Sequence, residues 1–204
     1  TRVSVDNAGN QGNGNSIVEV TSSLSGNGRF VVFGSDSALA AGDTGNSMDA
    51  YVRDVKKNLT TLVSIGPTGA SGNSDSAATS VSKNGRFVVF TSNATNLVTG
   101  DSNTTQDVFL RDRKKGVTTR LSVSSAGAES NNLNLHPRIS ANGKIVVFES
   151  YATNLVAGDA NGFADAFVHD VKKGITSLAS IDSAGLQATG DAGLLQAVLT
   201  NCIG

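Results

Sequence analysis

Three copies of one pattern follow each other along this chain of 204 residues. Gly-Asp pairs at positions 42–43, 100–101 and 158–159 mark the copies, and the period is 58 residues. A repeated unit of this size cannot bury its apolar face alone and stacks against copies of itself. The repeat therefore predicts a row of equivalent units, and it turns the question of function from catalytic residues to surfaces.

The middle copy predicts four short antiparallel strands. Asn84-Gly85 is a typical hairpin turn, because both residue types tolerate positive φ. The strand that follows this turn is apolar on both faces, which indicates burial on both sides. The last strand alternates apolar and polar residues, as expected of a strand with one wet face. The predicted ranges are 77–82, 86–91, 107–112 and 117–123.

The other two copies repeat this order, so the predicted fold is an all-β propeller of four-stranded antiparallel blades. We expect a single propeller domain over 1–204, with blade repeats at about 10–65, 70–123 and 128–181. Helical repeats are shorter and need a helical periodicity that is missing here. The strands expected in the first copy are 17–22, 29–35, 50–55 and 60–65, and those in the third are 136–140, 144–150, 166–171 and 175–181.

Three strings carry a family resemblance. They are Ser-x-Asn-Gly-Arg-Phe-Val-Val-Phe at 82–90, Asn-Leu-Val-x-Gly-Asp-x-Asn at 96–103 and Asp-x-Phe-x-x-Asp at 107–112. They resemble the TolB-type, WD40-like (PD40) β-propeller repeats of bacteria, and the third copy matches at 140–148, 154–161 and 165–170. The resemblance implies a propeller that acts as a binding scaffold in an extracellular, periplasmic or cell-envelope setting. It indicates fold more than function, because such blades host many activities.

The two ends do not complete a blade. Residues 1–5 match a fourth strand and residues 194–200 are placed like a first strand, so both are expected as unpaired strands of an incomplete blade. Closed propellers have about four blades or more. The ring would be completed either by self-association into a homo-oligomer or by further blades of a longer chain. Since the first residue is Thr1, a mature or excised piece of a longer protein is expected.

Composition excludes several function classes. Sixteen basic and seventeen acidic residues nearly balance, and Trp is absent, which argues against a nucleic-acid partner. No apolar run is long enough for a membrane span. The single cysteine, Cys202, excludes an internal disulfide and a cysteine-based metal cluster.

The loop between the second and third strands of each copy offers the best candidate site. Its Asp and Asn residues alternate in a way similar to a shortened calcium loop. The candidate calcium ligands are Asp43, Asn46 and Asp49 in the first copy, Asp101, Asn103 and Asp107 in the second, and Asp159, Asn161 and Asp165 in the third. The side chains supply only three ligands per loop and no bidentate Glu follows, so the favoured interpretation is that they cap the turn.

The remaining polar residues predict structure rather than catalysis, and no catalytic residue or cofactor site is predicted. Asp54, Asp112 and Asp170 are expected to cap the turns after the third strands, and the Lys pairs that follow them to be solvated. His169 is interpreted as a surface substitution, and His136 as a residue that could line the axial channel without a visible partner. The leading prediction is a non-enzymatic scaffold for a protein partner. The alternatives are a carbohydrate-binding module that uses the Asp and Asn loops, and an enzyme with a site at the axial channel.

Overall fold

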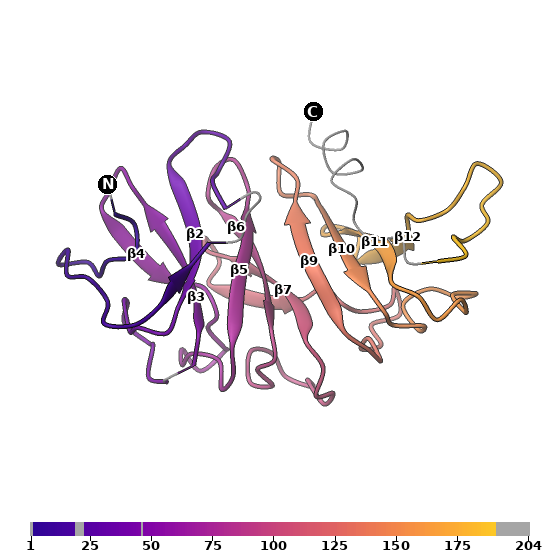
Figure 1. Cartoon of the computed structure of the whole chain (residues 1–204), viewed down its shortest axis with the longest axis horizontal. Helices are drawn as coiled ribbons and strands as arrows, with labels where there is room; N and C mark the ends of the chain where they lie inside the picture. Colours follow the sequence, from indigo (N-terminus) through magenta and orange to yellow (C-terminus); the bar gives the residue numbers. More distant parts are fainter. Residues whose placement is uncertain (1, 19–22, 46, 191–204) are drawn as a thin grey trace.

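The computed structural model describes residues 2–18, 23–45 and 47–190. Within these residues the chain forms three four-stranded antiparallel sheets, each with its strands in chain order. The sheets stand side by side as an open arc (Figure 1). The prediction of an all-β propeller with four-stranded blades is confirmed. In the described part of the chain no helix is long and apolar enough to cross a membrane.

We call the sheets blades 1, 2 and 3. Blade 1 consists of β1 (Ser16–Ile17), β2 (Phe30–Ser35), β3 (Asp49–Asp54) and β4 (Leu59–Leu62). Blade 2 consists of β5 (Ser76–Val81), β6 (Phe87–Ser92), β7 (Asp107–Asp112) and β8 (Val117–Arg120). Blade 3 consists of β9 (Asn134–Ile139), β10 (Ile145–Ser150), β11 (Asp165–Asp170) and β12 (Ile175–Leu178).

The observed strands differ from the expected ranges mainly at the blade edges. The fourth strands β8 and β12 end three residues before the predicted ends at 123 and 181. The predicted first strand of blade 1 is described only as β1 and a bridge between Leu24 and Val31, since residues 19–22 lie outside the described part. At the N-terminus, Val5 forms a single bridge with Gln11. The predicted terminal strand at 194–200 also lies outside the described residues.

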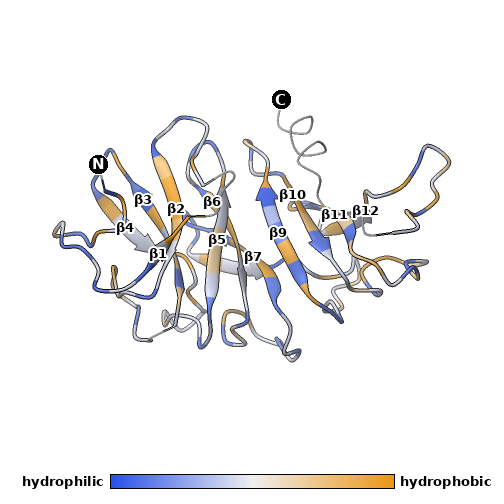
Figure 2. Ribbon diagram, in the orientation of Figure 1, coloured by the Kyte–Doolittle hydropathy of each residue, from blue (hydrophilic) through white to orange (hydrophobic). Residues whose placement is uncertain are grey.

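Neighbouring blades pack through opposite faces of their sheets. Val32, Ala50 and Val52 of blade 1 share a buried cluster with Val88 and Phe90 of blade 2. A second cluster joins the other face of blade 2 to blade 3. Because side chains alternate between the faces of a strand, a sheet that packs on both sides needs apolar residues at every position, which explains the continuous Phe-Val-Val-Phe strings. Figure 2 shows β2 as largely hydrophobic, whereas β9 carries hydrophilic segments.

Aromatic rings stack within each blade, and other rings pack against glycines of the next blade. Each blade stacks one ring of its second strand on one of its third, with centroids 5.5 to 5.7 Å apart. Phe30 of blade 1 lies against Gly85 of blade 2, and Phe87 of blade 2 lies against Gly143 of blade 3. A Cβ at Gly143 would approach Cδ2 of Phe87 to 2.4 Å, and the φ of Gly143 is +74°. Glycine is therefore required there on two counts, conformation and close approach.

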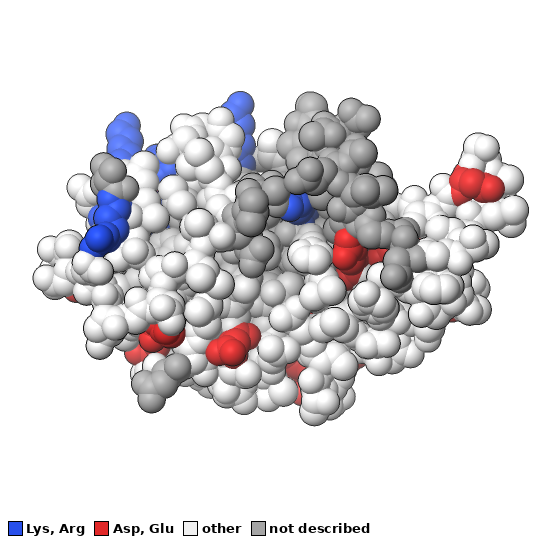
Figure 3. All heavy atoms as spheres, in the orientation of Figure 1, with Lys and Arg blue, Asp and Glu red and all other residues white. Residues whose placement is uncertain are grey.

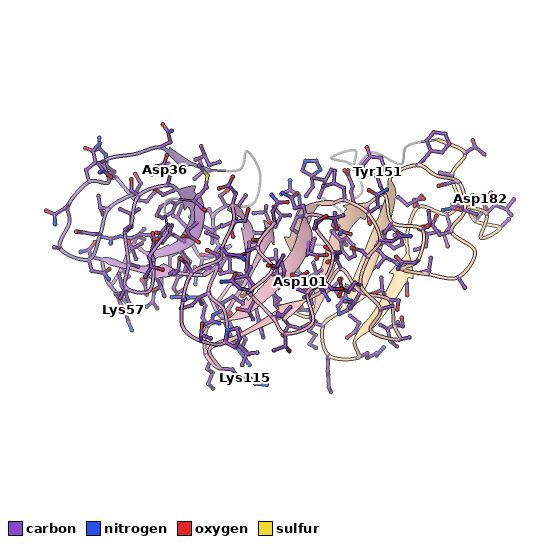
Figure 4. The ribbon with its side chains drawn as sticks, turned by 90° about the horizontal axis from the view of Figure 1, so that it is seen from below. Asp36, Lys57, Asp101, Lys115, Tyr151 and Asp182 are labelled. Carbon is purple, nitrogen blue, oxygen red and sulfur yellow. The ribbon has the colours of Figure 1, made fainter. Side chains whose placement is uncertain are left out.

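The two ends of the blades differ in charge. The first strands run upward and the second strands downward in Figure 1, so the loops between the second and third strands lie at the lower side. On the face drawn in Figure 3, Lys and Arg lie along the upper side, while Asp and Glu lie along the lower side and at the right. Figure 4 places Lys57 and Lys115, in turns after the third strands, at one edge of the arc, and Asp36 and Tyr151 at the opposite edge.

Candidate functional site

The last Asp of each predicted calcium loop forms a hydrogen bond within its own blade. Asp49, Asp107 and Asp165 are the first residues of β3, β7 and β11, and all three are buried. Each accepts a hydrogen bond of 2.5 Å from a serine hydroxyl that follows the fourth strand, from Ser64, Ser122 and Ser180 respectively. These bonds tie the start of the third strand to the end of the blade through serine hydroxyls, whereas the capping interpretation expected backbone N–H groups as the donors.

The predicted asparagine ligands present nitrogen to these carboxylates. Nδ2 of Asn103 donates to Asp107 Oδ2 at 3.1 Å, and Nδ2 of Asn161 donates to Asp165 Oδ2 at 2.9 Å. A cation would need the amide oxygen instead. Asn46 lies outside the described residues. Among the residues that the structure describes, no three His, Cys, Asp or Glu side chains form a group suited to a metal ion.

In blade 2 a guanidinium group occupies the space beside the carboxylates. Arg120, the last residue of β8, forms ion pairs with Asp101 at 2.9 Å, with Asp107 at 3.4 Å and with Glu129 at 3.3 Å. Burial raises the pKa of Asp101 to about 6, and the charge of Arg120 opposes that rise. In Figure 4 Asp101 lies near the middle of the arc. Arg120 therefore supplies the positive charge beside the carboxylates of this loop.

In blade 3 an amide takes the place of the guanidinium. Nε2 of Gln187 donates to Asp159 Oδ1 at 2.7 Å and to Asp165 Oδ2 at 2.8 Å. Burial raises the pKa of Asp159, and the bond from Gln187 opposes that rise. In blade 1, Leu62 stands at the position of Arg120 and Ser71 at the position of Gln187. Neither residue offers a guanidinium or amide group to the loop carboxylates.

The second series of repeated Asp residues caps turns, as predicted. Asp54 Oδ1 accepts bonds from the backbone N–H groups of Lys56 and Lys57, both at 3.1 Å. Asp54 also forms a bidentate pair with Arg29 at 2.9 and 2.6 Å. Hydrogen bonds from Arg29 lower the pKa of Asp54. Equivalent backbone bonds hold Asp112 and Asp170.

The interpretation of His169 as a surface residue is wrong. His169 is buried, and its Nδ1 lies 2.9 Å from the hydroxyl of Thr176. Arg111, at the same position of blade 2, makes the matching bond to Thr118 at 2.9 Å. The histidine thus replaces the arginine in a conserved packing role within the repeat, and burial lowers its pKa.

The other histidine lies in a pocket between the first strands of blades 2 and 3. β5 and β9 stand next to each other in Figure 1, and a hollow of about 180 Å³ opens beside them. His136 has a φ of +50°, which is uncommon for a residue other than glycine, and its side chain is 58 % exposed. The lining residues are Ala77, Thr79, Thr91, Gln106, Leu135, His136, Pro137 and Arg138.

His136 has an acidic partner that sequence reasoning missed. Its Nδ1 lies 3.0 Å from Oε2 of Glu149, whose side chain is only 10 % exposed. Both β5 and β9 contain a register shift in their pairing with the second strand. In blade 2 the residue that corresponds to His136 is Ala78, which is buried, whereas His136 is exposed. A bulge redirects a side chain, and in blade 3 it directs the imidazole into the pocket.

His136 and Glu149 could have been found in the sequence, because at these positions one copy of the repeat differs from the others. Where blades 1 and 2 have Gly34 and Thr91, blade 3 has Glu149. Ala78 of blade 2 likewise becomes His136. Positions that differ between otherwise matching copies do not serve the shared fold, so they are candidates for function. The same comparison singles out Arg120 and Gln187.

No family model matches the sequence, and no curated protein matches it. Solved structures similar to the chain include TolB from Acinetobacter baumannii, with a TM-score of 0.47 and 18 % identity over 82 % of this chain and 32 % of that one. The tricorn protease matches with a TM-score of 0.49 and 16 % identity over 77 % of this chain and 14 % of that one. The β-propeller domain of the Trilobed protease from Pyrococcus furiosus matches with a TM-score of 0.44 and 11 % identity, over 76 % of this chain and 40 % of that one.

The chain therefore spans less than half the length of each of these three structures. These structures include TolB, whose type of repeat the repeats of this chain resemble, and the blades themselves are shown by the three four-stranded antiparallel sheets. At these identities the matches say nothing of substrate or partner.

Proposed function

We propose that this chain is part of a β-propeller scaffold that binds a protein partner through the pocket between β5 and β9. The observation that carries the proposal is the conformation of His136, whose side chain is presented to the pocket from a strained backbone. Strain of this kind costs about 1–3 kcal/mol and persists where the surroundings enforce it, often at binding sites. Ala78 shows that a blade of this chain folds without the exposed imidazole.

The size of the pocket favours a macromolecular partner. Pockets for free small molecules usually measure about 300–1,000 Å³, whereas this one measures about 180 Å³. It would hold one side chain of a partner, and the partner's remaining contacts would lie on the surrounding surface. His136, Arg138 and Gln106 offer polar groups that would select a polar or acidic side chain.

The structure bears differently on the two alternatives predicted from the sequence, a carbohydrate-binding module and an enzyme. Carbohydrate-binding sites usually stack sugar rings on aromatic side chains, and the lining residues include no Phe, Tyr or Trp. The His136–Glu149 pair supports the enzyme alternative, because a carboxylate can orient an imidazole for proton transfer. A hydroxyl near this pair, that of Thr79, donates instead to the backbone oxygens of Val89 and Pro137.

We also propose that a further blade covers the outer face of blade 3. Val147, Ala166 and Val168 are half-buried there, while the corresponding residues of blade 2, Val89, Val108 and Leu110, are fully buried against blade 3. The further blade would come from a second copy, by self-association, or from a longer chain. An extracellular, periplasmic or cell-envelope location also stays a proposal, since it follows from the family resemblance.

A random peptide library displayed on phage tests the binding proposal. The library is selected on the protein and counter-selected on the His136→Ala variant, and the enriched peptides are measured by calorimetry. Peptides that bind the protein at least tenfold more tightly than the variant support the pocket as the binding site. Equal binding to both forms contradicts it. Mass spectrometry of the recovered peptides separates binding from the enzyme alternative, which predicts altered peptides.

A further inference from the structure

Blade 1 contains a carboxylate pair, the buried Asp49 and the half-buried Asp43, that lacks the counter-charge found in the two sister blades. Asp49 is fully buried, and within the described residues its Oδ2 has no hydrogen-bond partner. Its other oxygen, Oδ1, accepts the bond from Ser64. The Asp43 carboxyl group approaches Asp49 closely, and Asp75 adds further negative charge nearby. The unsatisfied oxygen thus belongs to a carboxyl group that has further negative charge beside it.

The sister blades show what this position requires. In blade 2 the guanidinium of Arg120 lies within 2.9 and 3.4 Å of both carboxylates. In blade 3 the amide of Gln187 donates to both, at 2.7 and 2.8 Å. A positive group or dipole between the two Asp side chains is therefore the rule of this repeat. Blade 1 has Leu62 at the position of Arg120 and Ser71 at the position of Gln187. Neither of these side chains can neutralise a carboxylate pair.

The Gly45 N–H donates to Asp43 Oδ1 at 3.3 Å, and the side chains around the blade 1 pair offer oxygen ligands. The Tyr51 hydroxyl contacts Oδ2 of Asp43, and Oγ of Ser71 lies close to this loop, where it accepts a bond from the Thr44 N–H at 3.4 Å. Oxygen donors with two carboxylates suit a hard divalent cation, and calcium accepts the irregular geometry of such a set more readily than magnesium. Sulfur and imidazole ligands are absent from this group of residues.

We propose that Asp43 and Asp49 bind a calcium-type divalent cation, which takes the place in blade 1 that Arg120 and Gln187 occupy in blades 2 and 3. Water and nearby backbone or hydroxyl oxygens complete the coordination. The cation also stabilises the junction of blades 1 and 2, because the backbone oxygen of Gly42 in this loop already accepts a bond from the N–H of Ser71 at 3.0 Å. With two carboxylates, the expected dissociation constant is about 0.1–1 mM, as in extracellular calcium modules.

Terbium luminescence and thermal unfolding test the site directly. Terbium ions occupy calcium sites and emit when a nearby tyrosine is excited, and Tyr51 touches Asp43. We expect terbium emission at pH 7.5 that calcium displaces, and that persists in the Tyr151→Phe variant. At 10 mM calcium the melting temperature should rise by about 2–8 °C relative to chelator. The response should be lost in Asp49→Asn and in Asp43→Asn, a change in a half-buried loop residue that the fold tolerates more easily.

Asp165→Asn is the matched control, since Asp165 has the same place in blade 3. It should keep the calcium response of the unmodified protein. The proposal is overturned if neither terbium nor calcium has an effect while Asp49→Asn still raises the melting temperature, because the pair then merely shares a proton. It is also overturned if Asp165→Asn abolishes the response. Neither result affects the peptide-binding test, which concerns another face of the chain.

Discussion

Replacing Asp49 and Asp107 by Asn makes the same change at the same position of two blades, with opposite expected effects. Both carboxylate oxygens of Asp107 accept hydrogen bonds. Oδ1 accepts one from the Ser122 hydroxyl, and Oδ2 accepts bonds from Asn103 and Arg120. An Asn amide would point its NH₂ group at donors there. In Asp49 only Oδ1 accepts, and Oδ2 has no partner among the described residues, while the Asp43 carboxyl group lies close by. There the NH₂ group of Asn gains an acceptor.

The pKa of Asp49 sets the magnitude of the expected change in the free energy of unfolding. Burial, with the neighbouring carboxylates, raises it from 3.8 to about 7, so the folded chain keeps a proton that the unfolded chain loses. The contribution of this group to stability therefore falls as the pH rises from about 4 to about 7, and stays low above that range. At about 1.4 kcal/mol per pH unit, the difference corresponds to at most about 4 kcal/mol.

We therefore expect Asp49→Asn to stabilise the protein at pH 8 by about 2–4 kcal/mol in the presence of chelator, and at pH 5 by only about 1–1.5 kcal/mol. Asp107→Asn should destabilise at pH 8 by about 1–3 kcal/mol, because it leaves buried donors without acceptors. Urea unfolding of both variants and of the unmodified protein at the two pH values measures these changes. Destabilisation by Asp49→Asn at pH 8 as large as that by Asp107→Asn would refute the reasoning.

Three further changes probe the packing and polar contacts. Gly143→Ala should lower stability by about 1–3 kcal/mol in thermal melts, because a Cβ meets the ring of Phe87; Gly158→Ala, which has positive φ but open space, should cost less. Arg120→Leu leaves Asp101, Asp107 and Glu129 without their cation and should cost about 3–5 kcal/mol at pH 8 by urea unfolding; a loss under 1 kcal/mol would contradict this. Tyr51→Phe, which copies Phe109 and Phe167, should cost about 1 kcal/mol in a thermal melt through loss of the hydroxyl bonds to Ser37 and Asp43, and an unchanged melt would count against those bonds.

Much of the blade could be predicted from local patterns. The Asn-Gly turns and the Phe-Val-Val-Phe strings specify hairpins and strands that are buried on both faces, and these are short-range properties. The ends of β8 and β12 could not be predicted, because the residues after them still alternate as in a strand. After Arg120 the Leu121 N–H still bonds to the Val108 carbonyl, but the Val108 N–H bonds to the Ser122 hydroxyl, so a side-chain bond replaces a bond of the β7–β8 ladder.

The sites were harder to predict, because they depend on contacts between distant segments. The loop carboxylates were identified, but their partners Arg120 and Gln187 lie 13 to 28 residues further along the chain. His136 was noted without a partner, since Glu149 reaches it only across the β9–β10 pair. At position 169 an Arg-to-His change resembles surface variation in the sequence, although the position is buried. Comparison of the three copies position by position recovers most of these residues.

The pocket around His136 is proposed to bind a protein segment. Hydrogen–deuterium exchange of the protein with and without a peptide selected from the library tests it most directly. We predict that protection appears in β5 and β9 and is absent in the His136→Ala variant, while the outer strands β4 and β8 are unchanged in both. Protection confined to the outer strands or to the loops at the acidic end, with β5 and β9 unaffected, would contradict the account.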